Sequence, residues 1–186
     1  MRRKLLFTYM ALMDFMINYR AIFRNIFGNL EKAQFFTNEL KKTIEAQVSE
    51  FKISEELITL CDKLIEEIKK GSLRRLYTLG YLFEEYRAEI MKYPQITVTP
   101  EIKVDIEKNI NLLKESLLTG NLAYAEYYLT KLQSTLRLAL PYISEYFVLL
   151  AEVDQKLYEA VALRKTELAI YYLGRFESLI RSLIEP

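Results

Sequence analysis

The chain has 186 residues, 51% hydrophobic and 27% charged, which excludes a disordered protein and is ordinary for a globular one. Lysine and arginine number 26 and aspartate and glutamate 25, so no overall field attracts nucleic acid or an anionic membrane. Histidine is absent, which removes the commonest general base, the Ser-His and Cys-His nucleophile pairs and nearly all zinc and di-iron sites of helical bundles. We therefore expect no catalytic, cofactor-binding or metal-binding residues and no enzyme.

The first helix is expected at the N-terminus, where a basic segment, residues 1–4, precedes an apolar run. This order resembles a signal peptide, but Asp14, Asn18 and Arg20 interrupt the run and no small-x-small cleavage pattern follows. A membrane span needs about 20 apolar residues without such interruptions. The segment therefore predicts a buried helix rather than a targeting or membrane segment.

The whole chain shows apolar residues at intervals of three and four, few glycines and no strand-like alternation. This pattern predicts an all-α protein. Gly28, Gly71 and Gly120 fall between adjacent helices, which indicates tight αα-hairpins. The expected helices, eight in four hairpins, cover residues 4–27, 30–49, 54–70, 73–92, 101–119, 122–139, 142–163 and 166–184.

An internal duplication is indicated by motifs that recur in the same order. They are Gly-Asn-Leu at 28–30 and 120–122, Ile-Ser-Glu at 53–55 and 143–145, and Leu-Gly at 79–80 and 173–174. The first motif extends to Gly-Asn-Leu-x-x-Ala-x-aromatic-aromatic in both places, so we expect the same helix-ending joint twice. Helical periodicity aligns leucines with leucines, but it does not align these motifs in order. The motifs therefore predict a tandem duplication.

The predicted domain organisation follows from that duplication. Residues 1–93 and 94–186 are expected to form two related four-helix halves, joined by a linker between Pro94 and Pro100 and packed as one unit. Two arrangements stay open: one pseudo-symmetric bundle, or a short right-handed solenoid.

A further pattern, Gly-x-Leu-x-x-Ala-x-x-Tyr, begins at Gly120. It resembles the second-helix part of a tetratricopeptide repeat, in which a small residue lets the partner helix approach. The units here lie 43 to 49 residues apart instead of 34, and the aromatic start of that repeat is missing. The resemblance covers the hairpin joints and implies a generic repeat of helical hairpins.

One cysteine, Cys61, excludes an intramolecular disulfide and fits a reducing compartment, so we expect a cytoplasmic protein. It lies on an apolar helix face with Leu57 and Leu64, which favours a core residue over a reactive thiol. The richness in Ile, Leu, Tyr, Lys and Glu, with no Trp, is typical of a thermophile with an AT-rich genome.

A row of aromatic residues runs along the first helix at four-residue spacing, with methionines beside it. Such a row either docks a partner helix or faces the core. Because this helix is apolar nearly all round, it is expected to be a buried centre or a subunit contact. The candidate docking residues are Phe15, Tyr19, Phe23 and Phe27.

A basic cluster surrounds the Gly71 turn, and a smaller one occupies the corresponding turn of the second half. Four positive charges beside a helix N-terminus can hold a phosphate, and tyrosines on the same helices can stack bases. The alternative is solvated cations that complement helix dipoles. The candidate nucleic-acid or phosphate contacts are Lys69, Lys70, Arg74, Arg75, Arg164 and Lys165.

Together these features favour a non-catalytic helical interaction subunit or adaptor of a larger intracellular assembly. Its partners are expected to be other protein subunits or further copies of itself, with no small-molecule ligand. The alternative is a subunit of a nucleoprotein complex that binds RNA or DNA through basic, tyrosine-rich helix faces. A third hypothesis is membrane-surface association through the first helix, although we expect no membrane partner.

Overall fold

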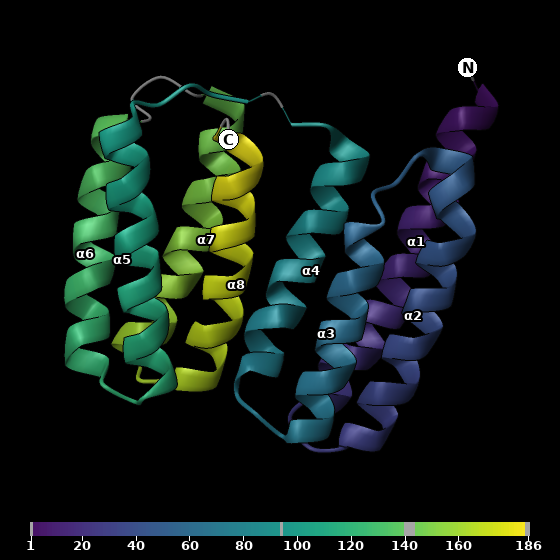
Figure 1. The fold of residues 1–186 in the computed structure, drawn as a ribbon, viewed down its shortest axis with the longest axis horizontal. Coiled ribbons are helices and arrows are strands. Elements are labelled where there is room, and N and C mark those ends of the chain that lie inside the picture. Colours follow the sequence, from purple (N-terminus) through teal and green to yellow (C-terminus); the bar gives the residue numbers. More distant parts are fainter. Residues whose placement is uncertain (1, 94, 140–143, 185–186) are drawn as a thin grey trace. The chain divides into compact units, whose positions relative to one another are not determined.

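The computed structural model describes residues 2–93, 95–139 and 144–184. Within them the chain forms helices and no strand, so the prediction of an all-α protein is confirmed (Figure 1). The eight helices are α1 (Arg2–Asn25), α2 (Leu30–Phe51), α3 (Glu56–Lys70), α4 (Arg74–Met91), α5 (Pro100–Leu118), α6 (Leu122–Ala139), α7 (Ser144–Ala162) and α8 (Thr166–Leu183). Pro94 of the expected linker and Ile143 of the second Ile-Ser-Glu motif lie outside the described residues.

The helix ends follow from local chemistry. At the start of α2, the side chain of Asn29 accepts a hydrogen bond from the amide of Lys32 at 3.0 Å. At the start of α5, Thr99 caps the helix and Pro100 occupies its first turn, where a missing N–H costs nothing. Gly71 and Gly120 end α3 and α5 with φ of 67° and 74°, a left-handed conformation that glycine adopts without strain.

The two Gly-Asn-Leu joints differ, contrary to our expectation of one joint made twice. After α5, the amide of Asn121 bonds to the Ser116 carbonyl at 2.8 Å, five residues back. After α1, the amide of Asn29 bonds to the Asn25 carbonyl at 2.8 Å, only four residues back, and Gly28 has no positive φ. The same tripeptide therefore supports two turn geometries. Which carbonyl accepts the hydrogen bond of the asparagine amide depends on how the preceding helix ends.

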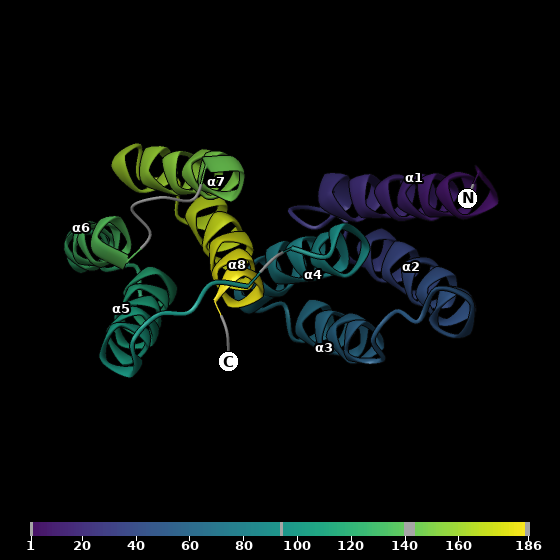
Figure 2. The same cartoon turned by 90° about the horizontal axis from the view of Figure 1, so that it is seen from above.

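The chain divides into two compact units, Met1–Lys92 and Tyr93–Pro186, called unit 1 and unit 2 below. In unit 1 each helix packs on the next, and α1 also contacts α4, which closes the ring of helices. Seen from above, α2 and α4 both lie on one side of α1 (Figure 2). The core receives fully buried side chains from every helix, among them Ile22, Leu40, Leu64 and Leu79. Unit 1 is therefore a four-helix bundle.

Unit 2 repeats this order, with sequential contacts from α5 to α8 and a closing contact between α5 and α8. Its core includes Leu113, Leu132, Leu157 and Phe176, all fully buried. The segment 95–99 before α5 is bound to the end of α8, since the amide of Ile96 donates to the Leu183 carbonyl at 2.6 Å. Both units thus use one helix plan, and the duplication stays a prediction.

Candidate functional site

The aromatic row of α1 is divided between core and surface. Phe15 and Tyr19 are 1% and 5% exposed. The Phe15 ring stacks on Tyr86 of α4 with centroids 3.8 Å apart, and Tyr19 lies 4.8 Å from Phe83. These two residues are therefore part of the core, and the docking hypothesis does not hold for them.

The other two members of the row lie nearer the surface. Phe23 is half-buried, Phe27 is 40% exposed, and their rings meet edge to face at 5.6 Å. Phe27 follows the end of α1 and belongs to the turn before α2. The row therefore changes from core to surface along the helix, because a spacing of four residues drifts around a helix of 3.6 residues per turn.

Beside Phe15, a buried hydrogen-bond network joins three helices. The hydroxyl of Tyr86 donates to Oε1 of Gln47 on α2 at 2.7 Å and lies 3.1 Å from the Ala11 carbonyl on α1. Burial raises the pKa of Tyr86, because the phenolate would lose its hydration. The Tyr86 side chain is fully buried and its hydroxyl has hydrogen-bond partners, so we assign it to stability rather than catalysis.

The basic cluster at the Gly71 turn contains one arginine that is committed to the fold. Arg75 is buried, and its Nη1 donates to the carbonyls of Gly71 and Ser72 at 2.8 and 2.7 Å. Its Nε donates to the Ile26 carbonyl at 3.2 Å. Arg75 therefore ties the end of α1 to the α3–α4 turn, which corrects the prediction that it is a phosphate contact.

The N-terminus of α4 is likewise satisfied from within. Ser72 Oγ accepts from the amide of Arg74 at 3.0 Å and donates to the carboxylate of Glu67 at 2.6 Å. The amides of Arg75 and Leu76 bond to carbonyls of the turn. Lys69, Lys70 and Arg74 are exposed, and Lys70 lies 3.6 Å from Glu67. An incoming phosphate would meet these three cations and an acid, but not the free amides that such sites use.

The corresponding turn of unit 2, between α7 and α8, carries Arg164 and Lys165, both exposed. Arg164 occupies the position that Gly71 holds in unit 1 and has a φ of 55°. The amide of Lys165 bonds to the Ala160 carbonyl at 2.8 Å, which completes the same helix-ending motif. This turn presents two cations that belong to a different unit from the Gly71 cluster.

The tyrosines of α6 form an exposed group on unit 2. Tyr124 and Tyr127 are 58% and 52% exposed, and Tyr128 stacks on Tyr124 with centroids 6.3 Å apart. The ammonium of Lys131 lies over the Tyr127 ring at 4.9 Å. Asp105 shares the adjoining groove. The group therefore combines one internal cation–π contact with a nearby acid, a weak basis for phosphate recognition.

The outward face of α1 carries exposed apolar residues that were not among the docking residues predicted from the sequence. Met10, Met13 and Ile17 are 54%, 43% and 61% exposed, and we call them the α1 stripe. They lie on the side of the helix opposite its buried residues, among them Phe15 and Ile22. Beside them Tyr9 is 61% exposed. Met10, Met13 and Ile17 are spaced three and four residues apart, which is visible in the sequence. The core-facing residues of the helix are also spaced for one helix face, so the sequence alone does not show which side is exposed.

Charge is also concentrated on α1. Its residues include five basic and one acidic side chain, whereas the rest of the chain carries 21 basic and 24 acidic ones. The overall balance of the sequence hides this local excess. Arg20 and Arg24 are exposed and continue the line of the α1 stripe toward the end of the helix. An apolar surface and a cationic surface therefore adjoin on one helix face.

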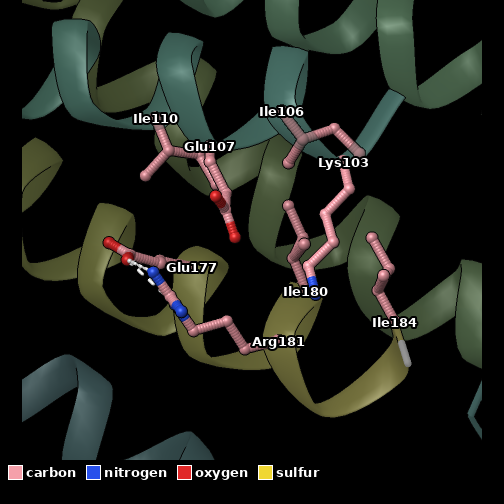
Figure 3. A pocket seen from close by; sticks show the side chains of 8 residues that line it. All are labelled: Lys103, Ile106, Glu107, Ile110, Glu177, Ile180, Arg181 and Ile184. Carbon is pink, nitrogen blue, oxygen red and sulfur yellow. Dashed lines mark hydrogen bonds and ion pairs between the residues drawn. The ribbon is translucent and has the colours of Figure 1, made fainter. Parts of the chain in front are cut away.

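A cavity of about 180 Å³ lies between α5 and α8 in unit 2 (Figure 3). Its apolar wall consists of four isoleucines, and Lys103 and Glu107 reach toward it from α5. Across it, Arg181 Nη2 lies 3.0 Å from Glu177, whose other oxygen lies 3.1 Å from Lys114. The carboxylate is thus neutralised by two cations. The lining offers no hydroxyl or thiol group, and we regard the cavity as a packing gap.

No protein-family model, curated protein sequence or solved structure matches the chain. Among the described residues, no three carboxylate or cysteine side chains are grouped as metal ligands would be. None of the described helices has the length and apolar character needed to cross a membrane.

Proposed function

We propose that the protein is a non-catalytic interaction subunit of a larger intracellular assembly and that it contacts a protein partner through the α1 stripe. One observation carries this proposal. Met10, Met13 and Ile17 are 43% to 61% exposed along a single face of a helix whose opposite face forms the core of unit 1. A helix that is apolar on both sides is typical of one that has neighbours on both sides.

The size and chemistry of the stripe suit a helix-to-helix contact. Covering the exposed halves of these three side chains is worth roughly 3 kcal/mol, from about 2 kcal/mol for a fully buried side chain. Methionine adapts its shape to a partner, and it is enriched at interfaces. Contacts beside the stripe, such as Tyr9, add area. The stripe therefore supplies the apolar centre of an interface and needs polar contacts around it for strong binding.

The nucleic-acid alternative has less support. Arg75 is used inside the fold, and the first amides of α4 already have acceptors. Lys69, Lys70 and Arg74 are exposed cations, and Lys70 lies 3.6 Å from Glu67. Nucleic-acid binding by these residues would be a weak, salt-sensitive contact.

The proposal is tested by affinity capture from the cells in which the gene naturally occurs. The tagged full chain is compared with the variant Met13→Asp/Ile17→Asp, whose changed side chains are exposed and leave the core untouched. A matched control, Val104→Asp/Leu138→Asp, changes two apolar residues of unit 2 that are 63% and 81% exposed. Circular dichroism establishes that all three proteins are folded.

We expect the wild type and the control to retain the same protein partners in stoichiometric amounts after nuclease treatment. The α1 variant should lose them. Partners that bind all three proteins equally would contradict the proposed surface. Partners that disappear with nuclease would favour the nucleoprotein alternative instead.

A further inference from the structure

The α1 stripe is part of a longer seam. Met10, Met13, Ile17, Arg20 and Arg24 follow one another at intervals of three, four, three and four residues. This is the spacing of the a and d positions of a coiled coil, which face a single partner helix. All five side chains are exposed. We call these five residues the α1 seam.

The seam has an apolar part and a cationic part of similar length. At 1.5 Å per residue, about 10 Å separate Met10 from Ile17, and about another 10 Å separate Ile17 from Arg24. Neither Arg20 nor Arg24 forms an ion pair with a described carboxylate. A partner that covers the whole seam must therefore place apolar groups on one half and negative charge on the other.

We infer that the α1 seam packs antiparallel against an amphipathic helix of a partner protein, with Asp or Glu in the first two turns of that helix and apolar residues in the next two. The inference rests on the proposed function and specifies the partner's chemistry. Carboxylates at the start of the partner helix complement Arg20 and Arg24 and also suit that helix's own dipole. The antiparallel orientation brings this start beside the end of α1 and aligns the two dipoles favourably.

A second copy of the chain is a poor occupant. In a parallel pair Arg20 faces Arg20, and Arg24 faces Arg24. In an antiparallel pair that joins Met13 to Ile17, Arg20 faces Met10. In both arrangements the arginines meet no carboxylate, and unlike-charge pairing at such positions is what sets partner choice.

An anionic membrane surface fits the arrangement less well than a helix does. On an interfacial helix, cations line a polar face along the length of the apolar one. Here Arg20 and Arg24 lie in line with the apolar residues and beyond them, at one end. Within the α1 seam the positive charge therefore lies at one end, as a partner helix with an acidic end would require.

The test uses two synthetic helical peptides of about 24 residues, a few heptads long. In the acidic peptide, five residues are placed to face the α1 seam at successive spacings of four, three, four and three. The first two of these residues are Glu and the other three are Leu. Its twin has Lys in place of Glu. Each labelled peptide is titrated with the full-length wild-type chain, with Arg20→Glu/Arg24→Glu, and with Lys63→Glu/Lys69→Glu. The last variant makes the same charge change on exposed residues of α3.

We expect the acidic peptide to bind the wild type about tenfold more tightly than the basic peptide at low salt, with the difference shrinking at high salt. The Arg20→Glu/Arg24→Glu variant should reverse the preference, and the α3 control should keep it. Equal binding of both peptides, or no binding of the acidic one, would overturn the inference. The inference would also be overturned if the wild type sedimented with phosphatidylserine-containing vesicles and the acidic peptide did not compete. Dimerisation of the wild type that Met13→Asp/Ile17→Asp abolishes would overturn it as well.

Affinity capture separates this inference from the proposed function. If partners are lost with Met13→Asp/Ile17→Asp but kept with Arg20→Glu/Arg24→Glu, the α1 stripe is an interface whose partner is not acidic. If neither pair of changes alters capture, both the interface and the partner's charge are wrong.

Discussion

In unit 1 the contact between the first and fourth helices consists of stacked rings, whereas in unit 2 the same contact consists of isoleucines and ion pairs. Phe15 and Tyr86 stack at 3.8 Å across α1 and α4. Across α5 and α8, Ile106 and Ile180 line a cavity of about 180 Å³, and Glu177 is held by two cations. One four-helix plan is therefore closed in two ways.

The difference shows what each kind of closure requires. Between α1 and α4 of unit 1 the rings of Phe15 and Tyr86 stack directly, and the buried Tyr86 hydroxyl needs the acceptor of Gln47. Between α5 and α8 of unit 2 the isoleucine side chains leave a cavity, and charged side chains border it.

The largest expected effect is that of Phe15→Ala. Removing this buried ring leaves a cavity against Tyr86 and should lower the free energy of unfolding of unit 1 by about 3–5 kcal/mol. Ile180→Ala in unit 2 should cost about 2 kcal/mol, because space beside it already exists. Hydrogen exchange read by mass spectrometry, which follows each unit separately, checks both values. Equal costs would show that the closures are energetically equivalent.

An intermediate effect is expected from alkaline pH on unit 1. Burial raises the pKa of Cys61 from 9.0 to about 12, and burial also raises the pKa of Tyr86 above its ordinary 10.0. When the pH lies between a group's pKa in the unfolded state and its pKa in the folded state, the group is deprotonated in the unfolded state and still protonated in the folded state. Stability is therefore fully present below about pH 9 and falls as pH rises toward 12, by up to about 1.4 kcal/mol per pH unit for each group.

Urea unfolding of unit 1 at a series of alkaline pH values measures this decline. The double variant Cys61→Ala/Tyr86→Phe, although less stable at neutral pH, should show a flatter dependence. An unchanged slope in that variant would assign the alkaline sensitivity to other groups.

The smallest effect concerns the turns that join the third and fourth helices of each unit. Arg164 has a φ of 55° where unit 1 has Gly71 at 67°. Because a left-handed conformation strains residues with a Cβ, Arg164→Gly should raise the free energy of unfolding by about 1 kcal/mol. Gly71→Ala should lower the free energy of unfolding by a similar amount. The left-handed backbone is the whole cost, because an added Cβ at this position meets no atom within 4 Å. Thermal denaturation of both variants checks the opposite signs.

Sequence periodicity predicted the helices well, because each helix depends on neighbours three and four residues away. The expected helix at 122–139 is observed as Leu122–Ala139, and that at 30–49 as Leu30–Phe51. The candidate site was predicted less well. Arg75 was expected at the surface, yet it binds the Ile26 carbonyl, 49 residues away in the chain. No local pattern records such a partner.

The sequence by itself therefore determined the secondary structure, the hairpin turns and the absence of histidine chemistry, which depend on residue type and short-range spacing. Only the tertiary structure decided which side of α1 faces the core. Both sides carry apolar residues at helical spacing, so the positions of α2 and α4 had to be known before Phe15 was separated from Met13 and Ile17. Burial depends on what packs from elsewhere in the chain, and for that reason the proposed interface emerged from the fold.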